Sequence, residues 1–83
     1  MSTLSQLLYE GTKVLREAGV EGAERDARWL LAAASNIPRA RLTLHGPDQV
    51  SDDTHAAFQR YLNARVARQP VSQIIGTRTF FGR

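Results

Sequence analysis

The 83-residue sequence contains no cysteine, which excludes a disulfide and any thiolate metal site. Long apolar runs are also missing, since no segment approaches the roughly 20 residues that are needed to span a bilayer. The N-terminus has neither the basic segment nor the long apolar segment of a signal peptide. We therefore expect a soluble, cytoplasmic protein with no membrane partner, stabilised by the packing of its own elements.

Acidic residues are missing from the C-terminal third. All eight lie within residues 1–53, where the net charge is −2, whereas residues 54–83 hold five arginines and have a net charge of +5. Such a basic region suits an acidic or phosphate-bearing partner, and the alternative is a solvated arginine face. Because arginine clusters fit acidic protein surfaces, the candidate partner-binding residues are Arg39, Arg41, Arg60 and Arg68.

Apolar residues recur with helical spacing in three long segments. The first covers residues 4–18, with Ser2 or Thr3 as its N-cap and Gly19 just beyond its end. The second begins near Gly22 or Ala23 and ends around residues 35–36, and the third begins after Ser51 and stops before Pro70. Short helical turns are expected over residues 38–42 and 71–75, the latter closed by Gly76. The pattern predicts an all-α bundle of four to five helices, of which three are long.

The apolar stripes define the expected core. Val14 and Val66 also fall on these stripes, and Gly11 lies within the first, where a glycine allows another helix to cross closely. The residues predicted to form the structural core are Leu7, Leu8, Leu15, Ala27, Leu30, Leu31, Phe58 and Leu62.

The second helical segment is predicted to be central to the bundle, because its apolar stripe is rich in alanine and lets neighbours approach. Asp26 and Trp29 lie at the border between its apolar and polar faces. We interpret Asp26 as a structural acceptor for an arginine such as Arg65 or Arg28. Trp29 is expected in the core or at its edge, with a partner hot spot as the alternative.

Sequence motifs for catalysis or cofactor binding are also missing. The chain has no glycine-rich phosphate loop, no dinucleotide fingerprint and no nucleophile elbow. His45 and His55 could be combined with Asp48 and Asp52, but this spacing matches no standard metal-ligand pattern. We therefore expect no catalytic, cofactor-binding or metal-binding residue in this chain. Nucleic acid is a disfavoured partner, because no element interleaves basic and aromatic residues.

Residues 77–81 combine β-branched and aromatic residues and predict the beginning of a strand. A single strand has no partner here, and Phe80 and Phe81 would form an apolar patch. We therefore expect residues 1–76 to form a helical domain and residues 77–83 to begin a linker. The parent protein is expected to continue into a second domain.

Three segments together resemble a known family. Residues 26–31 resemble the D-A-x-x-L-L signature in the N-terminal domain of HemK/PrmC-type protein-(glutamine-N5) methyltransferases. Residues 70–76 are similar to the P-[VI]-x-[YH]-[IL]-x-G segment of this family, and residues 77–82 are similar to the run that begins its linker hairpin. The sequence departs from the pattern at Arg68, Gln69, Gln73 and Thr79.

The resemblance implies a parent enzyme that methylates the glutamine of the GGQ motif in class I peptide chain release factors. Its methyl donor, S-adenosylmethionine, and its Asn-Pro-Pro-Tyr motif belong to a C-terminal domain absent from this sequence. The N-terminal domain is implied to grip the release factor. Other readings are a free-standing basic helical domain that binds RNA or an acidic protein, and a dimerisation module that uses Phe80 and Phe81.

Overall fold

The structure is a computed structural model that describes residues 3–76. In chain order its elements are α1 (Leu4–Glu17), α2 (Ala23–Ser35), the 3₁₀ helix η1 (Arg39–Arg41), α3 (Asp52–Val66) and α4 (Val71–Gly76). The prediction of an all-α fold with three long helices is confirmed for this range. Its only strand-like feature is an isolated bridge between Thr3 and Gln49. The expected hairpin start, with Phe80 and Phe81, lies outside the described residues.

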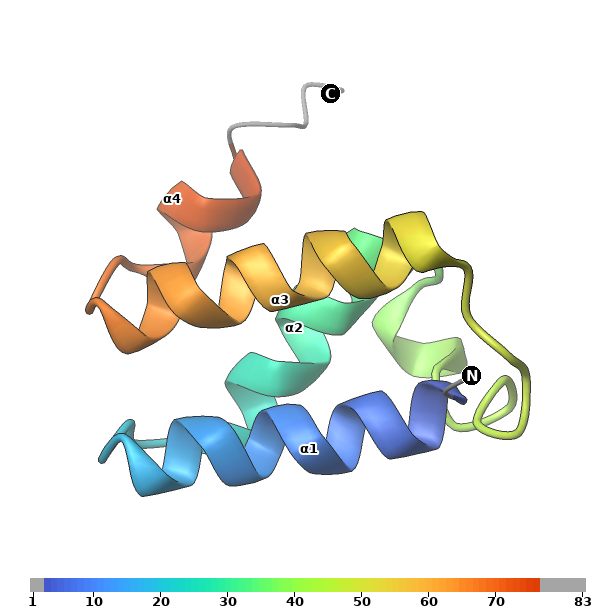
Figure 1. Cartoon of the computed structure of the whole chain (residues 1–83), viewed down its shortest axis with the longest axis horizontal. Coiled ribbons are helices and arrows are strands. Elements are labelled where there is room, and N and C mark those ends of the chain that lie inside the picture. The colour runs from blue at the N-terminus through green and yellow to red at the C-terminus, as the bar shows by residue number, and fades with distance from the viewer. Residues whose placement is uncertain (1–2, 77–83) are drawn as a thin grey trace.

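The helices pack around α2. Figure 1 shows α1 and α3 running in the same direction, with α2 crossing them and α4 lying against one end of α3. Among the described elements, α2 contacts α1, α3, α4 and η1. The predicted central position of this helix is therefore confirmed. None of the helices within residues 3–76 is both long and apolar enough to cross a membrane.

Local signals define the helix ends. The Thr3 hydroxyl accepts a hydrogen bond from the Gln6 backbone N–H at 3.2 Å, and the Gln6 side chain accepts one from the Thr3 N–H at 3.0 Å. This reciprocal pair is a capping box. Gly19 follows α1 with a φ of 82°, which suits the left-handed turn that often ends a helix. Ser51 caps α3 by accepting from the Thr54 N–H at 3.1 Å.

The core lies where α1, α2 and α3 meet. Seven of the eight predicted core residues are buried, and these are Leu7, Leu15, Ala27, Leu30, Leu31, Phe58 and Leu62. Leu8 is only partly buried, because it lies at the border of the core beside a surface cleft. The prediction was also wrong for Val14 and Val66, which are 42% and 38% exposed. Val14 precedes Leu15 and so lies about 100° around the helix from it, outside the packed face.

The close helix crossing predicted at Gly11 is confirmed. Gly11 lies under the ring of Phe58, and a Cβ atom at this position would be 2.5 Å from Phe58 Cζ and 2.9 Å from Cε2. Phe58 is completely buried. Only a glycine therefore lets α1 and α3 approach with this ring between them.

Candidate partner-binding surface

Asp26 joins α2 to α3 through a buried ion pair. Its side chain accepts a hydrogen bond from Arg65 Nε at 3.0 Å, and Arg25 Nε lies 3.7 Å from its other oxygen. Asp26 itself is only 4% exposed. The predicted structural role of Asp26 is thus confirmed with Arg65 as partner. The alternative partner, Arg28, lies 3.9 Å from Glu24 on the same helix.

The prediction that Trp29 lies in the core or at its edge is wrong, because this residue is 38% exposed and is not among the hydrophobic residues packed against the core. The guanidinium of Arg39 stacks on its ring, with the guanidinium carbon 3.8 Å from the ring centroid. This cation–π contact links α2 to η1. The sequence did not indicate this contact. The turn between α2 and η1 brings the two side chains together, and no helical spacing relates Trp29 to Arg39.

A shallow groove runs beside Trp29, between α2 and α4. Its volume is about 320 Å³. The residues that line it are Arg25, Asp26, Trp29, Val71, Ser72 and Ile75. Because Asp26 is already paired with Arg65, the groove combines an apolar floor with a basic rim.

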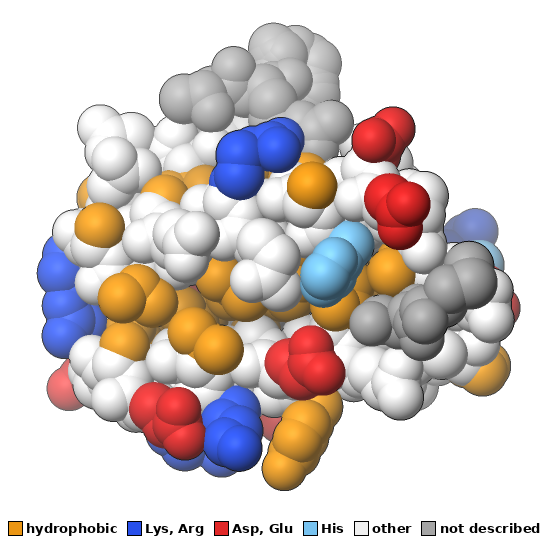
Figure 2. Space-filling model, in the orientation of Figure 1, with side chains coloured by type: hydrophobic (Ala, Val, Ile, Leu, Met, Phe, Trp, Pro, Cys, Tyr) orange, Lys and Arg blue, Asp and Glu red, His pale blue; other side chains and the backbone are white. Residues whose placement is uncertain are grey.

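The four candidate arginines do not form one patch. Arg39 and Arg41 lie on η1 and are exposed, while Arg60 lines a separate groove beside Ala34 at the end of α2. Arg68 follows α3, and its Nη2 donates a hydrogen bond to the Ala18 carbonyl at 2.9 Å. On the face formed by α1 and α3, Figure 2 shows hydrophobic side chains along the seam between these helices and charges scattered around it.

Arg68 therefore has a structural role that its sequence position did not indicate. Its φ of 75° is left-handed, a conformation that costs about 1–2 kcal/mol for a residue with a Cβ. We expect Arg68→Ala to lower the free energy of unfolding by about 1 kcal/mol, because it keeps this strain and loses the hydrogen bond. Arg68→Gly relieves the strain and should be nearly neutral. Urea unfolding of both variants measures the difference, and equal losses would contradict this account.

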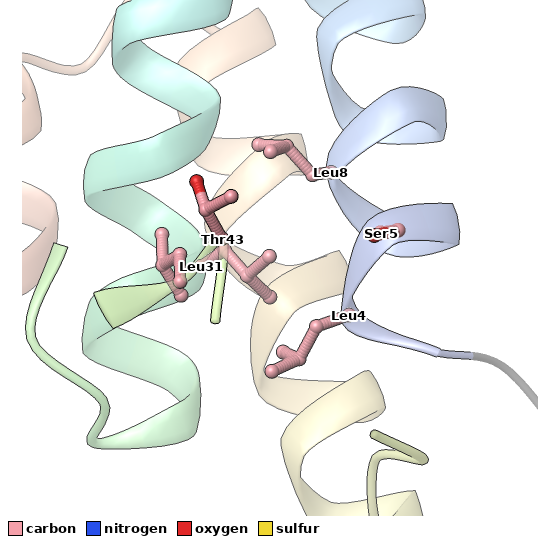
Figure 3. A pocket seen from close by; sticks show the side chains of 6 residues that line it. Leu4, Ser5, Leu8, Leu31 and Thr43 are labelled. Carbon is pink, nitrogen blue, oxygen red and sulfur yellow. The ribbon is translucent and has the colours of Figure 1, made fainter. Parts of the chain in front are cut away.

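A second cleft lies between α1 and the segment that follows η1. Figure 3 shows Leu4, Ser5 and Leu8 of α1 facing Leu31 of α2 and Thr43. Leu42 completes the lining, and the volume is about 230 Å³. The cleft is mainly aliphatic and holds no charged group, so its chemistry suits only an apolar side chain.

Of the residues weighed as metal ligands, His45 and Asp48 are in contact. His45 Nδ1 lies 2.8 Å from the Asp48 carboxylate, an exposed contact within one turn. Across residues 3–76, no group of three or more histidine, cysteine or acidic residues is placed to hold a metal ion. The turn has an architectural function, because the Gly46 and Asp48 carbonyls accept hydrogen bonds from the first backbone N–H groups of α1, those of Ser5 and Leu4.

The family model described as PrmC N-terminal domain matches residues 6–76. The chain belongs to this family. It is 55% identical over 69 residues to a release factor glutamine methyltransferase of Cereibacter sphaeroides, covering 83% of this chain and 25% of that protein. It is 34% identical to the same-named protein of Geobacter sulfurreducens, covering 96% and 28% of the two chains. A bifunctional methyltransferase of Rickettsia prowazekii is 30% identical, with 98% and 16% covered.

The chain thus spans between 16% and 28% of the length of these relatives. No solved structure matches it. Within this PrmC N-terminal domain, the apolar positions of the D-A-x-x-L-L pattern, Ala27, Leu30 and Leu31, are completely buried. Asp26 forms the ion pair between helices. The pattern therefore marks the architecture of the domain, since three of its residues lie in the core and the fourth joins α2 to α3.

Proposed function

We propose that this chain is the substrate-recognition domain of an S-adenosylmethionine-dependent methyltransferase. The proposed substrate is the glutamine in the GGQ motif of class I peptide chain release factors, which is methylated on its side-chain nitrogen. The observation that carries this proposal is the family match over residues 6–76, supported by the relative that is 55% identical and named a release factor glutamine methyltransferase.

In this proposal residues 1–76 form the recognition domain and residues 77–83 begin the linker to a C-terminal methyltransferase domain in the same cytoplasmic protein. The methyl donor and the catalytic groups belong to that second domain. The recognition domain contributes by holding the release factor in a productive orientation, which can supply a large part of a rate enhancement. A half-exposed tryptophan with a stacked arginine supports this role, because these residue types dominate the energetics of protein interfaces.

The test is a methyl-transfer assay with the parent protein, a class I release factor and radiolabelled S-adenosylmethionine. We expect the parent protein to label the release factor, and a release factor with the GGQ glutamine changed to alanine to stay unlabelled. The 83-residue chain serves as the control that should transfer nothing. Labelling of other proteins in place of the release factor would overturn the proposal.

A separate prediction concerns the methyl donor. We expect the 83-residue chain to show no saturable heat on calorimetric titration with S-adenosylmethionine, because the proposed donor site lies in the C-terminal domain. The parent protein is the matched positive control. Saturable binding by the short chain would show that the donor site extends into this domain.

RNA binding is a second candidate function, favoured by the net charge of +5 in residues 54–83. The structure reduces the charge that is available for it, since Arg65 is paired with buried Asp26. Arg68 keeps its charge, but one of its N–H groups is already bonded to the Ala18 carbonyl. Titration of the chain with labelled RNA at several salt concentrations separates the candidates. A steep loss of affinity with salt, starting from tight binding, would favour RNA.

A further inference from the structure

We infer that the groove beside Trp29 docks an acidic segment of the release factor, one that carries an apolar side chain next to a carboxylate. The inference rests on the proposed function and adds to it the surface and the chemistry of recognition. The proposed docking surface consists of the guanidinium of Arg39 stacked on Trp29, the basic rim of the groove at Arg25 and the apolar floor of the groove between α2 and α4.

The stacking prepares Arg39 to receive a carboxylate. With its central carbon 3.8 Å from the Trp29 centroid, the guanidinium has one flat side covered by the indole, while its N–H groups project from the edge. Within residues 3–76, the Arg39 guanidinium forms neither an ion pair nor a hydrogen bond with another residue, and only the backbone carbonyl of Arg39 accepts one, from the Leu42 N–H. A planar guanidinium held in this way can bind a carboxylate with two hydrogen bonds. Little further side-chain entropy is lost on binding, because the stacking already restricts the side chain.

The groove next to it supplies the apolar contact. Val71 and Ile75 of α4 are partly buried and form its floor together with Trp29. The Arg25 side chain on its rim is 70% exposed, and it only approaches Asp26, at 3.7 Å. Asp26 does not offset this charge, because Arg65 donates to it at 3.0 Å. An apolar side chain flanked by an acid complements this surface.

The C-terminal residues of the chain itself fit this groove less well than an acidic segment does. Residues 77–83 directly follow α4, but they contain Arg78 and Arg83 and no acidic residue. Their positive charge is therefore unfavourable beside Arg25 on the rim and beside Arg39, which lies over Trp29 next to the groove. Charge complementarity favours an acidic segment of another protein.

The test measures the dissociation constant of the parent protein and a class I release factor by calorimetry, together with methyl-transfer kinetics. We expect Arg39→Glu to weaken binding about tenfold or more and to raise KM while leaving kcat unchanged. Arg39→Lys should weaken binding several-fold, because it keeps the charge and loses the planar fork. Lys13→Glu is the matched control, since it makes the same charge reversal on α1, which contributes nothing to the groove.

Thermal unfolding shows whether each variant stays folded, and Arg25→Glu is the second variant if Arg39→Glu lowers Tm. An unchanged dissociation constant in both variants would overturn the docking site while the proposed function stands. A parent protein that neither binds nor methylates the release factor would instead overturn the proposed function. Weaker RNA binding by Arg39→Glu, with unchanged release factor binding, would assign the groove to RNA and reject the inference.

Discussion

Arg65→Ala is expected to lower the free energy of unfolding by about 3 kcal/mol, since removal of one partner of a buried ion pair strands the other charge. Asp26 is 4% exposed, and the Arg65 side chain is 22% exposed. Arg25, 3.7 Å away, can only partly compensate. We therefore place the loss at the lower end of the range for buried pairs. Urea unfolding followed by circular dichroism measures it.

Arg28→Ala is the matched control for this prediction. It removes an arginine from the 3.9 Å pair with Glu24, in which both side chains are at least half exposed. Exposed pairs within one helix contribute about 0.3–0.5 kcal/mol, so this variant should be close to wild type. Similar losses in the two variants would show that burial of Asp26 is not the cause. Asp26→Asn provides a second check, because it removes the stranded charge and should cost less than Arg65→Ala.

Phe58→Ala is expected to cost about 3–5 kcal/mol, as is usual for a phenylalanine removed from a core. Phe58 is completely buried and lies directly over Gly11 of α1. A domain of this length has a total stability of about 4–12 kcal/mol. The variant should therefore unfold at a much lower urea concentration than the wild type. A part of its molecules should be unfolded even without urea.

The Gly11 position offers a sharper test of the same crossing. Gly11→Ala gains about 1 kcal/mol of helix propensity, but its Cβ would lie 2.5 Å from Phe58 Cζ. Overpacking of this kind costs about 1–3 kcal/mol, so the single variant should be destabilised. In a Phe58→Leu background the ring atoms are gone, and the same substitution should become neutral or stabilising. A double-mutant cycle by urea unfolding measures this change of sign, and additive effects would contradict the close packing.

The all-α class, the helix bounds and most of the core could be predicted from the sequence, because these depend on local signals. Thr3 and Ser51 cap helices through bonds within one turn, and Gly19 needs only its own left-handed φ. Apolar spacing located seven of eight core residues. It misplaced Leu8, Val14 and Val66, since periodicity gives a helix face and does not give the width that neighbouring helices cover.

The candidate surface was less predictable. The sequence singled out four arginines by charge alone, and the structure separates them: Arg39 stacks on Trp29, Arg60 borders another groove and Arg68 bonds to the end of α1. Charge is a property of composition. The contacts of a long arginine side chain depend on elements that lie 10 to 50 residues away in sequence.

The sequence by itself determined that this chain is helical, that its second long helix carries the family pattern, and that Asp26 has a structural role. Those properties follow from residue types and short spacings. Only the tertiary structure decided that Arg65 is the partner of Asp26, that Gly11 lies under Phe58, and that Trp29 borders an open groove. Each of these depends on how the helices cross, and crossing is set by the packing of side chains from distant segments.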